Sequence, residues 1–226
     1  MSEIKQESPL VGRPEAVRGS TSRGDSSVTL RERPFLGHIS LRGQSDDQAF
    51  TAAASKVLGV ALPTTPNTQA AGKGIIACWM GPTEWLLLTE DEACQDWLDR
   101  LRDVLAEVHA GVVELSGGQT LIEIRGPYAA DTLAKGTTID LHPRSFGAEQ
   151  CTRTLLAHST VFIRVLEPGT AFQVVVRRSF ADHIWHWLCD SAAEYGYKVE
   201  PPESALAQAA AAPEPALAAE SAAPEA

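Results

Sequence analysis

The sequence lacks the features that mark several large classes of protein. It has no apolar run approaching the roughly 18–20 residues of a membrane-spanning helix, so we expect no membrane span. Acidic residues outnumber lysine and arginine, and the net charge of −10 disfavours nucleic acid as a partner. The four cysteines form no C-x-x-C pair, and Lys5 is not followed by the apolar segment of a secretory signal. We therefore expect a cytoplasmic protein whose reduced thiols pack in apolar surroundings.

Nucleotide-binding motifs occur only as fragments. Residues 115–119 spell LSGGQ, the signature loop of ABC-type ATPases, but the chain contains no G-x-x-x-x-G-K-[ST] loop to hold phosphate. Residues 119–125 alternate between two faces, which indicates a half-buried strand where an ATPase signature would open a helix. Residues 72–77 match G-x-G-x-x-A, yet a β-rich run follows them where a dinucleotide site needs a helix. We interpret the first fragment as a bend before a strand and the second as a flexible approach to a strand.

Candidate catalytic and metal-binding side chains are isolated in the sequence. No nucleophile elbow, G-x-S-x-G, is present. His183, His186 and Asp190 recur at i, i+3 and i+7 on one expected helix, where a solvated or interface face is favoured and a metal site is the alternative. Arg177 and Arg178 end an expected strand. They could hold a carboxylate or phosphate, or form an ion pair across a subunit interface, and the sequence leaves both alternatives open.

The two ends of the chain differ in composition from its middle. Residues 1–27 are rich in Ser, Gly and Arg and lack apolar periodicity, and residues 200–226 are rich in Ala, Pro and Glu without Lys or Arg. Neither segment can bury an apolar core, so both are predicted to be disordered. One folded domain is therefore expected over residues 28–199.

Within this domain, the hydrophobic periodicity predicts similar elements in two consecutive halves. In each half, a hairpin with a Pro-containing turn leads into a Trp-bearing amphipathic helix, and residues 63–74 are expected to form a loop. The expected helices are 45–58, 89–108, 128–135 and 179–195, and the expected strands are 33–42, 75–80, 84–89, 119–125, 151–157, 161–166 and 171–177. This weak repeat predicts an α+β fold in which two ferredoxin-like β-α-β-β-α halves, about 28–111 and 112–199, form one sandwich domain.

The helix boundaries are predicted from capping residues. Ser45 and Ser179 are candidate N-caps, and Thr89 with Glu92 has the spacing of a capping box. Gly59 stands where a left-handed residue would end the first helix. We therefore expect helices to begin close to residues 45, 89 and 179.

Two tryptophans, Trp185 and Trp187, stand two positions apart on the last expected helix. Residues at i and i+2 do not share a helix face, so both rings cannot enter the same core. An exposed tryptophan is typical of a binding surface, which favours an interface over the alternative of a thick two-sided core. The candidate subunit-interface residues are Trp185, His183, His186, Arg177 and Arg178.

Four segments together resemble one family, the γ subunit of heterotetrameric sarcosine oxidase. They are SPL at 8–10, CWMGPTEWLLL at 78–88, ELSGGQTLIEIRGPYAADTLAKGTTIDLHPRSF at 114–146 and RSFADHIWHWLCDSAAEYG at 178–196. Their order along the chain agrees with that family. The third segment is also similar, more distantly, to the folate-binding domain of aminomethyltransferases, although Glu114 stands where that wider pattern has aspartate.

The resemblance implies an accessory role in a complex that oxidatively demethylates sarcosine to glycine. In that family the α and β subunits carry the flavin (FAD and FMN), NAD and tetrahydrofolate chemistry, and the δ subunit holds zinc. This chain would then join α, β and δ and contribute no catalytic, cofactor-binding or metal-binding residue. The alternatives are the equivalent subunit of a related N-methyl amino acid oxidase or dehydrogenase, and a free-standing folate-binding protein similar to aminomethyltransferases. A metal-dependent hydrolase that uses His183 and His186 is a third alternative.

Overall fold

The computed structural model describes residues 7–12 and 27–203. The parts of the two predicted disordered segments at 1–6, 13–26 and 204–226 lie outside the described residues. Within the described part of the first segment, Leu10 is only 5% exposed and packs into the core. Within that of the second, the backbone N–H of Glu203 donates to the Glu32 carbonyl over 3.1 Å. No helix within the described ranges is long and apolar enough to cross a membrane.

The strands form two sheets. Sheet A has six strands in the order β11-β1-β7-β10-β9-β8, and sheet B has five in the order β3-β4-β5-β2-β6. The strands of sheet A are β1 (Val28–Arg33), β7 (Gln119–Arg125), β8 (Cys151–Leu156), β9 (Ser159–Glu167), β10 (Ala171–Arg177) and β11 (Tyr197–Glu200). Those of sheet B are β2 (Leu36–Arg42), β3 (Gln69–Gly72), β4 (Ile75–Gly81), β5 (Glu84–Glu90) and β6 (Gly111–Glu114). The α-helices are α1 (Gln48–Leu58), α2 (Asp91–Val104), α3 (Ala129–Ala134) and α4 (Ala181–Ala192).

Sheet A is built from two separated parts of the chain, whereas sheet B is built from one continuous part. β1 lies between β11 and β7 in sheet A, although the next strand, β2, belongs to sheet B. β2 to β6 follow one another in the chain and all belong to sheet B, where β6 pairs with β2. The predicted α+β fold with two sheets is confirmed, but the predicted boundary at 111/112 does not separate the sheets. Hydrophobic periodicity places residues on a face of a strand and carries no information about which sheet that strand enters.

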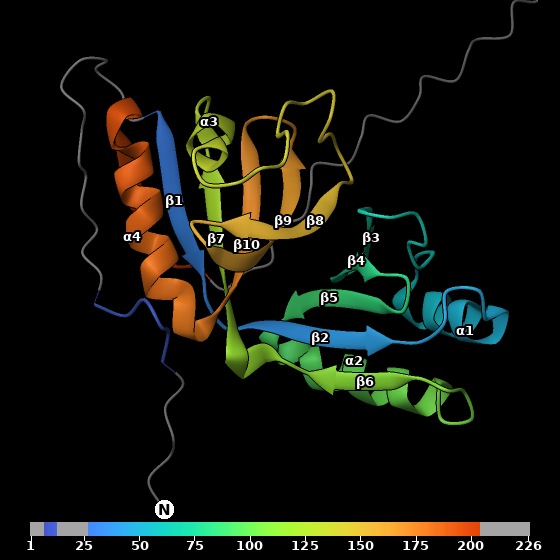
Figure 1. Ribbon diagram of the computed structural model, residues 1–226. Coiled ribbons are helices and arrows are strands. Elements are labelled where there is room, and N and C mark those ends of the chain that lie inside the picture. The colour runs from blue at the N-terminus through green and yellow to red at the C-terminus, as the bar shows by residue number, and fades with distance from the viewer. Residues whose placement is uncertain (1–6, 13–26, 204–226) are drawn as a thin grey trace, which may run out of the picture.

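Three apolar clusters hold the layers together, and Figure 1 shows the two sheets meeting with helices on their outer sides. One cluster joins α3 and α4 to the outer face of sheet A, and a second joins α1 and α2 to the outer face of sheet B. The third and smallest cluster lies between the sheets and includes Leu88, Leu121 and Phe162. Because this cluster is small, the apolar contact between the two sheets covers only part of their inner faces.

The observed helix starts differ from several predicted caps. The N-cap of α1 is Asp47, whose Oδ1 accepts from the backbone N–H of Ala49 over 2.8 Å, and Ser45 lies outside the helix. Thr89 is still part of β5 and donates to the Gly74 carbonyl over 2.9 Å, so the predicted capping box is wrong. A 3-10 turn, η2 (Arg178–Phe180), precedes α4 and makes Phe180 its N-cap in place of Ser179. At Thr89, a hydrogen bond across the sheet replaced the predicted local capping role.

Other local predictions agree with the structure. Gly59, with φ of 67°, ends α1 as predicted. The hairpin β4–β5 and the strand β7 form where the alternation indicated them. The expected loop at 63–74 contains β3, which pairs with β4 around Gly74, whose φ is 78°. The G-x-G-x-x-A fragment is therefore a hairpin turn between two strands, with no helix to receive a pyrophosphate.

Gly126, which directly follows β7, lies against the backbone of Ser27 and allows a mutational test of that contact. Its φ is 121°, and a Cβ there would lie 2.1 Å from the Ser27 carbonyl oxygen. We expect Gly126→Ala to lower the free energy of unfolding by about 1–3 kcal/mol, because both the backbone angle and the contact oppose a side chain. Gly81→Ala is the matched control, because nothing lies within 4 Å of a Cβ at that position. Equal unfolding midpoints of the two variants in urea would contradict the described path of the chain.

Candidate functional site

A row of polar side chains crosses the inner face of sheet A. The strand register aligns Arg31, Glu123, Gln173, Arg164 and Cys151 on five adjacent strands. Nε of Arg164 donates to Oε1 of Gln173 over 2.7 Å, and Nε2 of Gln173 donates to Oε2 of Glu123 over 3.0 Å. All three of these side chains are buried. We call this set of five residues the polar row.

The polar row also joins the two sheets. Nη1 of Arg164 donates to Oε1 of Gln69 over 2.8 Å, and Gln69 lies on β3 of sheet B. Burial by itself raises the pKa of Glu123, but hydrogen bonds from Arg125, Arg33 and Gln173 outweigh burial and hold that pKa below its usual range. A buried charge whose partner is removed is strongly destabilising. The buried members of the polar row, Glu123, Gln173 and Arg164, are therefore a structural tie between the sheets.

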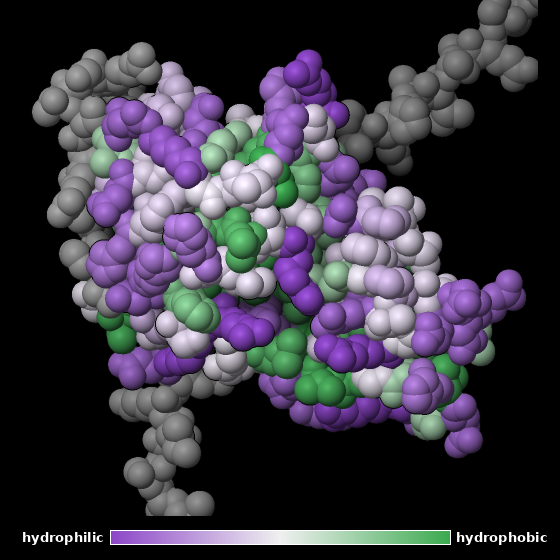
Figure 2. Space-filling model, viewed as in Figure 1, coloured by the Kyte–Doolittle hydropathy of each residue, from purple (hydrophilic) through white to green (hydrophobic). Residues whose placement is uncertain are grey.

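Beyond the polar row the sheets separate and enclose a cleft of about 540 Å³. Leu121, Phe162 and Val175 form an apolar row next to the polar row and pack against sheet B. After them, inner-face residues of both sheets line the open space. We call it the inter-sheet cleft, and its polar and apolar lining includes Arg42, Glu84 and Val113 from sheet B and Gln119, Arg153 and Arg177 from sheet A. Figure 2 shows hydrophilic and hydrophobic surface meeting along the junction of the two sheets.

The inter-sheet cleft has an excess of positive charge. Glu84 pairs through Oε1 with Nη2 of Arg42 at 3.1 Å and through Oε2 with Nη2 of Arg153 at 3.2 Å. One carboxylate of sheet B thus holds an arginine from each sheet. Arg177 is exposed and forms no ion pair with any of the described residues. Three arginines and one glutamate line the cleft of a protein whose net charge is −10.

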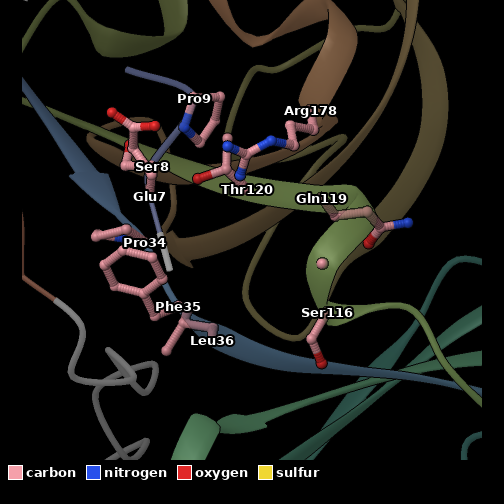
Figure 3. Close-up of a pocket in the computed structure, with 11 residues that line it drawn as sticks. Glu7, Ser8, Pro9, Pro34, Phe35, Leu36, Ser116, Gln119, Thr120 and Arg178 are labelled. Atoms are coloured by element: carbon pink, nitrogen blue, oxygen red, sulfur yellow. The ribbon is translucent and has the colours of Figure 1, made fainter. Parts of the chain in front are cut away.

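A second hollow, of about 340 Å³, lies where the chain passes between the sheets. Figure 3 shows the segment around Phe35, the LSGGQ segment and Arg178 around it, with the Arg178 side chain extending toward Thr120. The LSGG residues form a 3-10 turn, η1 (Ser116–Gly118), and Ser116 Oγ accepts from the backbone N–H of His38 over 3.1 Å. The interpretation of LSGGQ as a bend before a strand is confirmed.

The comparison with known proteins places the chain in a family. Residues 42–194 match the model of the sarcosine oxidase, gamma subunit family. The chain is 33% identical over 190 residues to the sarcosine oxidase subunit gamma of Corynebacterium sp. (strain U-96), and the alignment covers 83% of this chain and 90% of the relative. The chain belongs to the sarcosine oxidase gamma subunit family. The corresponding subunit of Arthrobacter sp. is 31% identical over 181 residues, which cover 79% of this chain and 85% of that one.

Solved structures agree with this family membership. The heterotetrameric sarcosine oxidase from Corynebacterium sp. U-96, in complex with pyrrole 2-carboxylate, contains a chain that matches with a TM-score of 0.74 and 31% identity. That match covers 89% of this chain and 98% of the other. The glycine cleavage system aminomethyltransferase T from Bartonella henselae matches with a TM-score of 0.60 and 15% identity, over 78% of this chain and 48% of that one. The second likeness shows a shared fold alone.

Within this gamma subunit, Trp185 is covered by the N-terminal segment. Trp185 is only 5% exposed and lines, with Leu10 and Val11, a hollow of about 340 Å³. The segment is fastened by Ser8, whose Oγ donates to Oε2 of buried Glu32 over 2.5 Å. Trp185 is therefore not exposed among the described residues, because residues 7–12 lie over its flank of α4, and its assignment to a subunit interface stays a prediction.

Trp187, on another flank of α4, is half-buried, and its ring would lie 2.4 Å from a Cβ at Gly136. The two rings are therefore directed to different sides of the helix, as their spacing requires, and each side meets part of the chain. This is the two-sided core that the sequence offered as the alternative. The helix has apolar partners on both flanks, α3 on one and the N-terminal segment on the other. These two partners come from distant parts of the chain.

The other candidate interface residues are exposed. His183 Nε2 lies 3.0 Å from the Ala157 carbonyl oxygen, and His186 Nδ1 lies 2.9 Å from the Asp182 carbonyl oxygen. Within residues 7–12 and 27–203, no group of three or more His, Cys, Asp or Glu side chains is arranged to hold a metal ion. Arg177 and Arg178 are consecutive but line different hollows, the inter-sheet cleft and the hollow beside Phe35. Their assignment to a subunit interface stays a prediction.

Two features of the inner faces were missed in the sequence. Glu84, Arg42 and Arg153 lie far apart in the chain, so nothing in their spacing indicated that they meet. The only sequence signal was a charged residue within an expected strand, on one of the two alternating faces. Glu84 in the segment EWLLLT and Arg153 in the segment CTRTLL are such residues. Arg164 and Glu123 stand within apolar runs, VFIRVL and LIEIR, which indicates a charge that folding must bury and pair.

His38, on the inner face of β2, makes the stability of the fold depend on pH. It is 1% exposed, its Nδ1 lies 2.9 Å from the Leu36 carbonyl oxygen, and its Nε2 has no hydrogen-bond partner among the described residues. Burial lowers the pKa of His38 to about 4, although the hydrogen bond to Leu36 opposes that shift. The ring is therefore neutral in the folded protein at neutral pH.

We expect stability to fall as the pH drops from about 6.5 to about 4, because the unfolded chain binds a proton that folded His38 does not. His38→Gln should remove up to about 3 kcal/mol of this loss, measured by urea unfolding at successive pH values. His109→Gln is the control, since His109 is exposed, and it should keep the wild-type slope. Parallel pH profiles for wild type and His38→Gln would contradict the buried neutral ring.

Proposed function

We propose that this chain is a non-catalytic accessory subunit of a heterotetrameric sarcosine oxidase, which oxidatively demethylates sarcosine to glycine. The observation that carries this proposal is the match to a chain of such an assembly, with a TM-score of 0.74 and 98% of that chain covered. Because the match extends over the whole relative, the present chain has the complete fold of that subunit. The alternative is the equivalent subunit of a complex that acts on another N-methylated amino acid.

The environment of the ionisable groups supports a non-catalytic role. A hydrogen bond with Cys78 and burial raise the pKa of the Cys151 thiol above its ordinary value, so it stays protonated and a poor nucleophile. The Glu123 carboxylate is buried and engaged by arginines, which leaves it unsuited to accept a proton at neutral pH. These groups stabilise the fold, and catalysis is assigned to the partner subunits.

The partners in this proposal are the α, β and δ subunits, which would hold FAD, FMN, NAD, tetrahydrofolate and zinc. The exposed Arg177, Arg178, His183 and His186 remain the candidate contact residues for those subunits. Trp185 reaches a partner only if the segment at 7–12 moves away from it. We further propose that the complex acts in the cytoplasm.

The proposal predicts that the chain co-purifies with its partners and is inactive alone. The test co-expresses it with tagged α, β and δ subunits from the same genome and measures subunit stoichiometry and sarcosine oxidation. We expect one copy per complex and faster turnover of sarcosine than of dimethylglycine or N-methylglutamate. An active complex that forms without this chain would contradict the accessory role. Tight binding of tetrahydrofolate by the lone chain, seen in its tryptophan fluorescence, would favour a free-standing folate-binding protein.

A further inference from the structure

We propose that the inter-sheet cleft is the docking site for an acidic segment of a partner subunit. A carboxylate of that segment pairs with Arg177, and its apolar side chains cover Val113 and Leu155. This inference rests on the proposed function, because it takes for granted that the chain is a subunit of a larger complex.

The charge of the cleft selects an acidic partner. Arg177 has no ion-pair partner within the described part of the chain, whereas Glu84 already engages Arg42 and Arg153. The guanidinium group of Arg177 is therefore the available cation, in a concave site where low-dielectric walls strengthen its field. A guanidinium group binds a carboxylate through two parallel hydrogen bonds, which adds geometric specificity to the charge attraction. A positively lined cleft on an acidic protein also steers an acidic segment to this site and repels other acidic surfaces.

The apolar residues beside the cleft indicate that the partner is a polypeptide. Val113 is 53% exposed on β6, the edge strand of sheet B, and Leu155 is 54% exposed on β8, the edge strand of sheet A. Val113 lines the cleft, and Leu155 lies two positions from Arg153 and so shares its face of the strand. Exposed apolar side chains on edge strands promote aggregation unless something covers them. A small ligand confined to the cleft leaves Leu155 exposed, whereas a segment that lies across the cleft from β6 to β8 covers both residues.

The acidic C-terminal segment of this same chain is the competing occupant. Residues 204–226 carry three glutamates and no Lys or Arg. However, the described part of the chain ends at Glu203, which pairs with Arg31 and Arg33 on β1. In sheet A, Arg177 lies on β10, two strands from β1, and Arg153 lies on β8, four strands from β1. Because Glu203 is held at β1, on the far side of the sheet from Arg153, a segment of another subunit is the occupant that we propose.

The test is reversal of charge in the cleft of the full-length chain. Arg177→Glu should weaken the binding of this subunit to the immobilised complex of the other subunits by at least tenfold, mainly through slower association. Arg144→Glu is the matched control, because Arg144 is exposed on a loop outside the cleft and should bind as the wild type does. Far-UV circular dichroism and thermal unfolding of each variant show that it is folded. Equal affinity of Arg177→Glu and Arg144→Glu would overturn the docking site.

Two further measurements identify the occupant. A photoreactive amino acid at Leu155 should cross-link in the assembled complex to an acidic segment of a partner subunit, mapped by mass spectrometry. A cross-link to residues 204–226 of the same chain would overturn the proposal. A chain that ends at Glu203 should assemble normally and show the same loss with Arg177→Glu, and disappearance of that loss would also overturn it.

Failure of the docking site and failure of the proposed function are distinguishable. If the wild-type chain does not bind the other subunits, the proposed function is wrong and the cleft has no partner to receive. If the wild type binds and Arg177→Glu binds equally well, the chain is a subunit that docks through another surface. Binding of the wild type should weaken as salt is added, and binding of Arg177→Ala should depend less on salt. This result would support the cleft, and not another surface, as the docking site.

Discussion

The insertion of the whole of sheet B between β1 and β7 of sheet A is the constraint on which the rest of the molecule depends. The chain leaves sheet A after Arg33 and enters sheet B at Leu36, and it returns through the 3-10 turn at Ser116–Gly118. Sheet A therefore joins strands from both sides of the segment that builds sheet B. The buried Arg164 then links Gln173 of sheet A to Gln69 of sheet B, so that the inner faces stay at a fixed separation. Buried ionic groups of this kind contribute specificity of arrangement more reliably than net stability.

The position of the cleft follows from this arrangement. Along the inner face of sheet A, a polar row is followed by an apolar row, and then by half-buried Gln119 and exposed Arg177. The sheets touch at the first two rows and separate at the third. A site whose walls are already fixed in place loses little conformational entropy when a partner segment binds. Glu84 pairs with Arg42 and Arg153, whereas Arg177 is left without an ion-pair partner among the described residues.

Local elements of this fold could be predicted from the sequence, and its connections could not. Alternation around Ile122 and the glycine at Gly59 correctly indicated β7 and the end of α1, because each depends on neighbouring residues. The family was predicted from four segments, since their combined order is specific. The place of β1 in sheet A, the cover over Trp185 by Leu10 and the meeting of Glu84 with Arg153 depend on contacts between distant residues. Thr89 shows the same limit at a single position, because its hydroxyl bonds to Gly74 across the sheet and not to the helix that follows.

The central claim is that this gamma subunit serves its complex through a docking cleft and not through an active site of its own. The most direct measurement is the structure of the assembled complex that contains this chain, solved by electron cryo-microscopy. The account predicts an acidic segment of a neighbouring subunit across the cleft from β6 to β8, with a carboxylate against the guanidinium group of Arg177. A cleft filled only with solvent, with the subunit contacts on other faces, would contradict it.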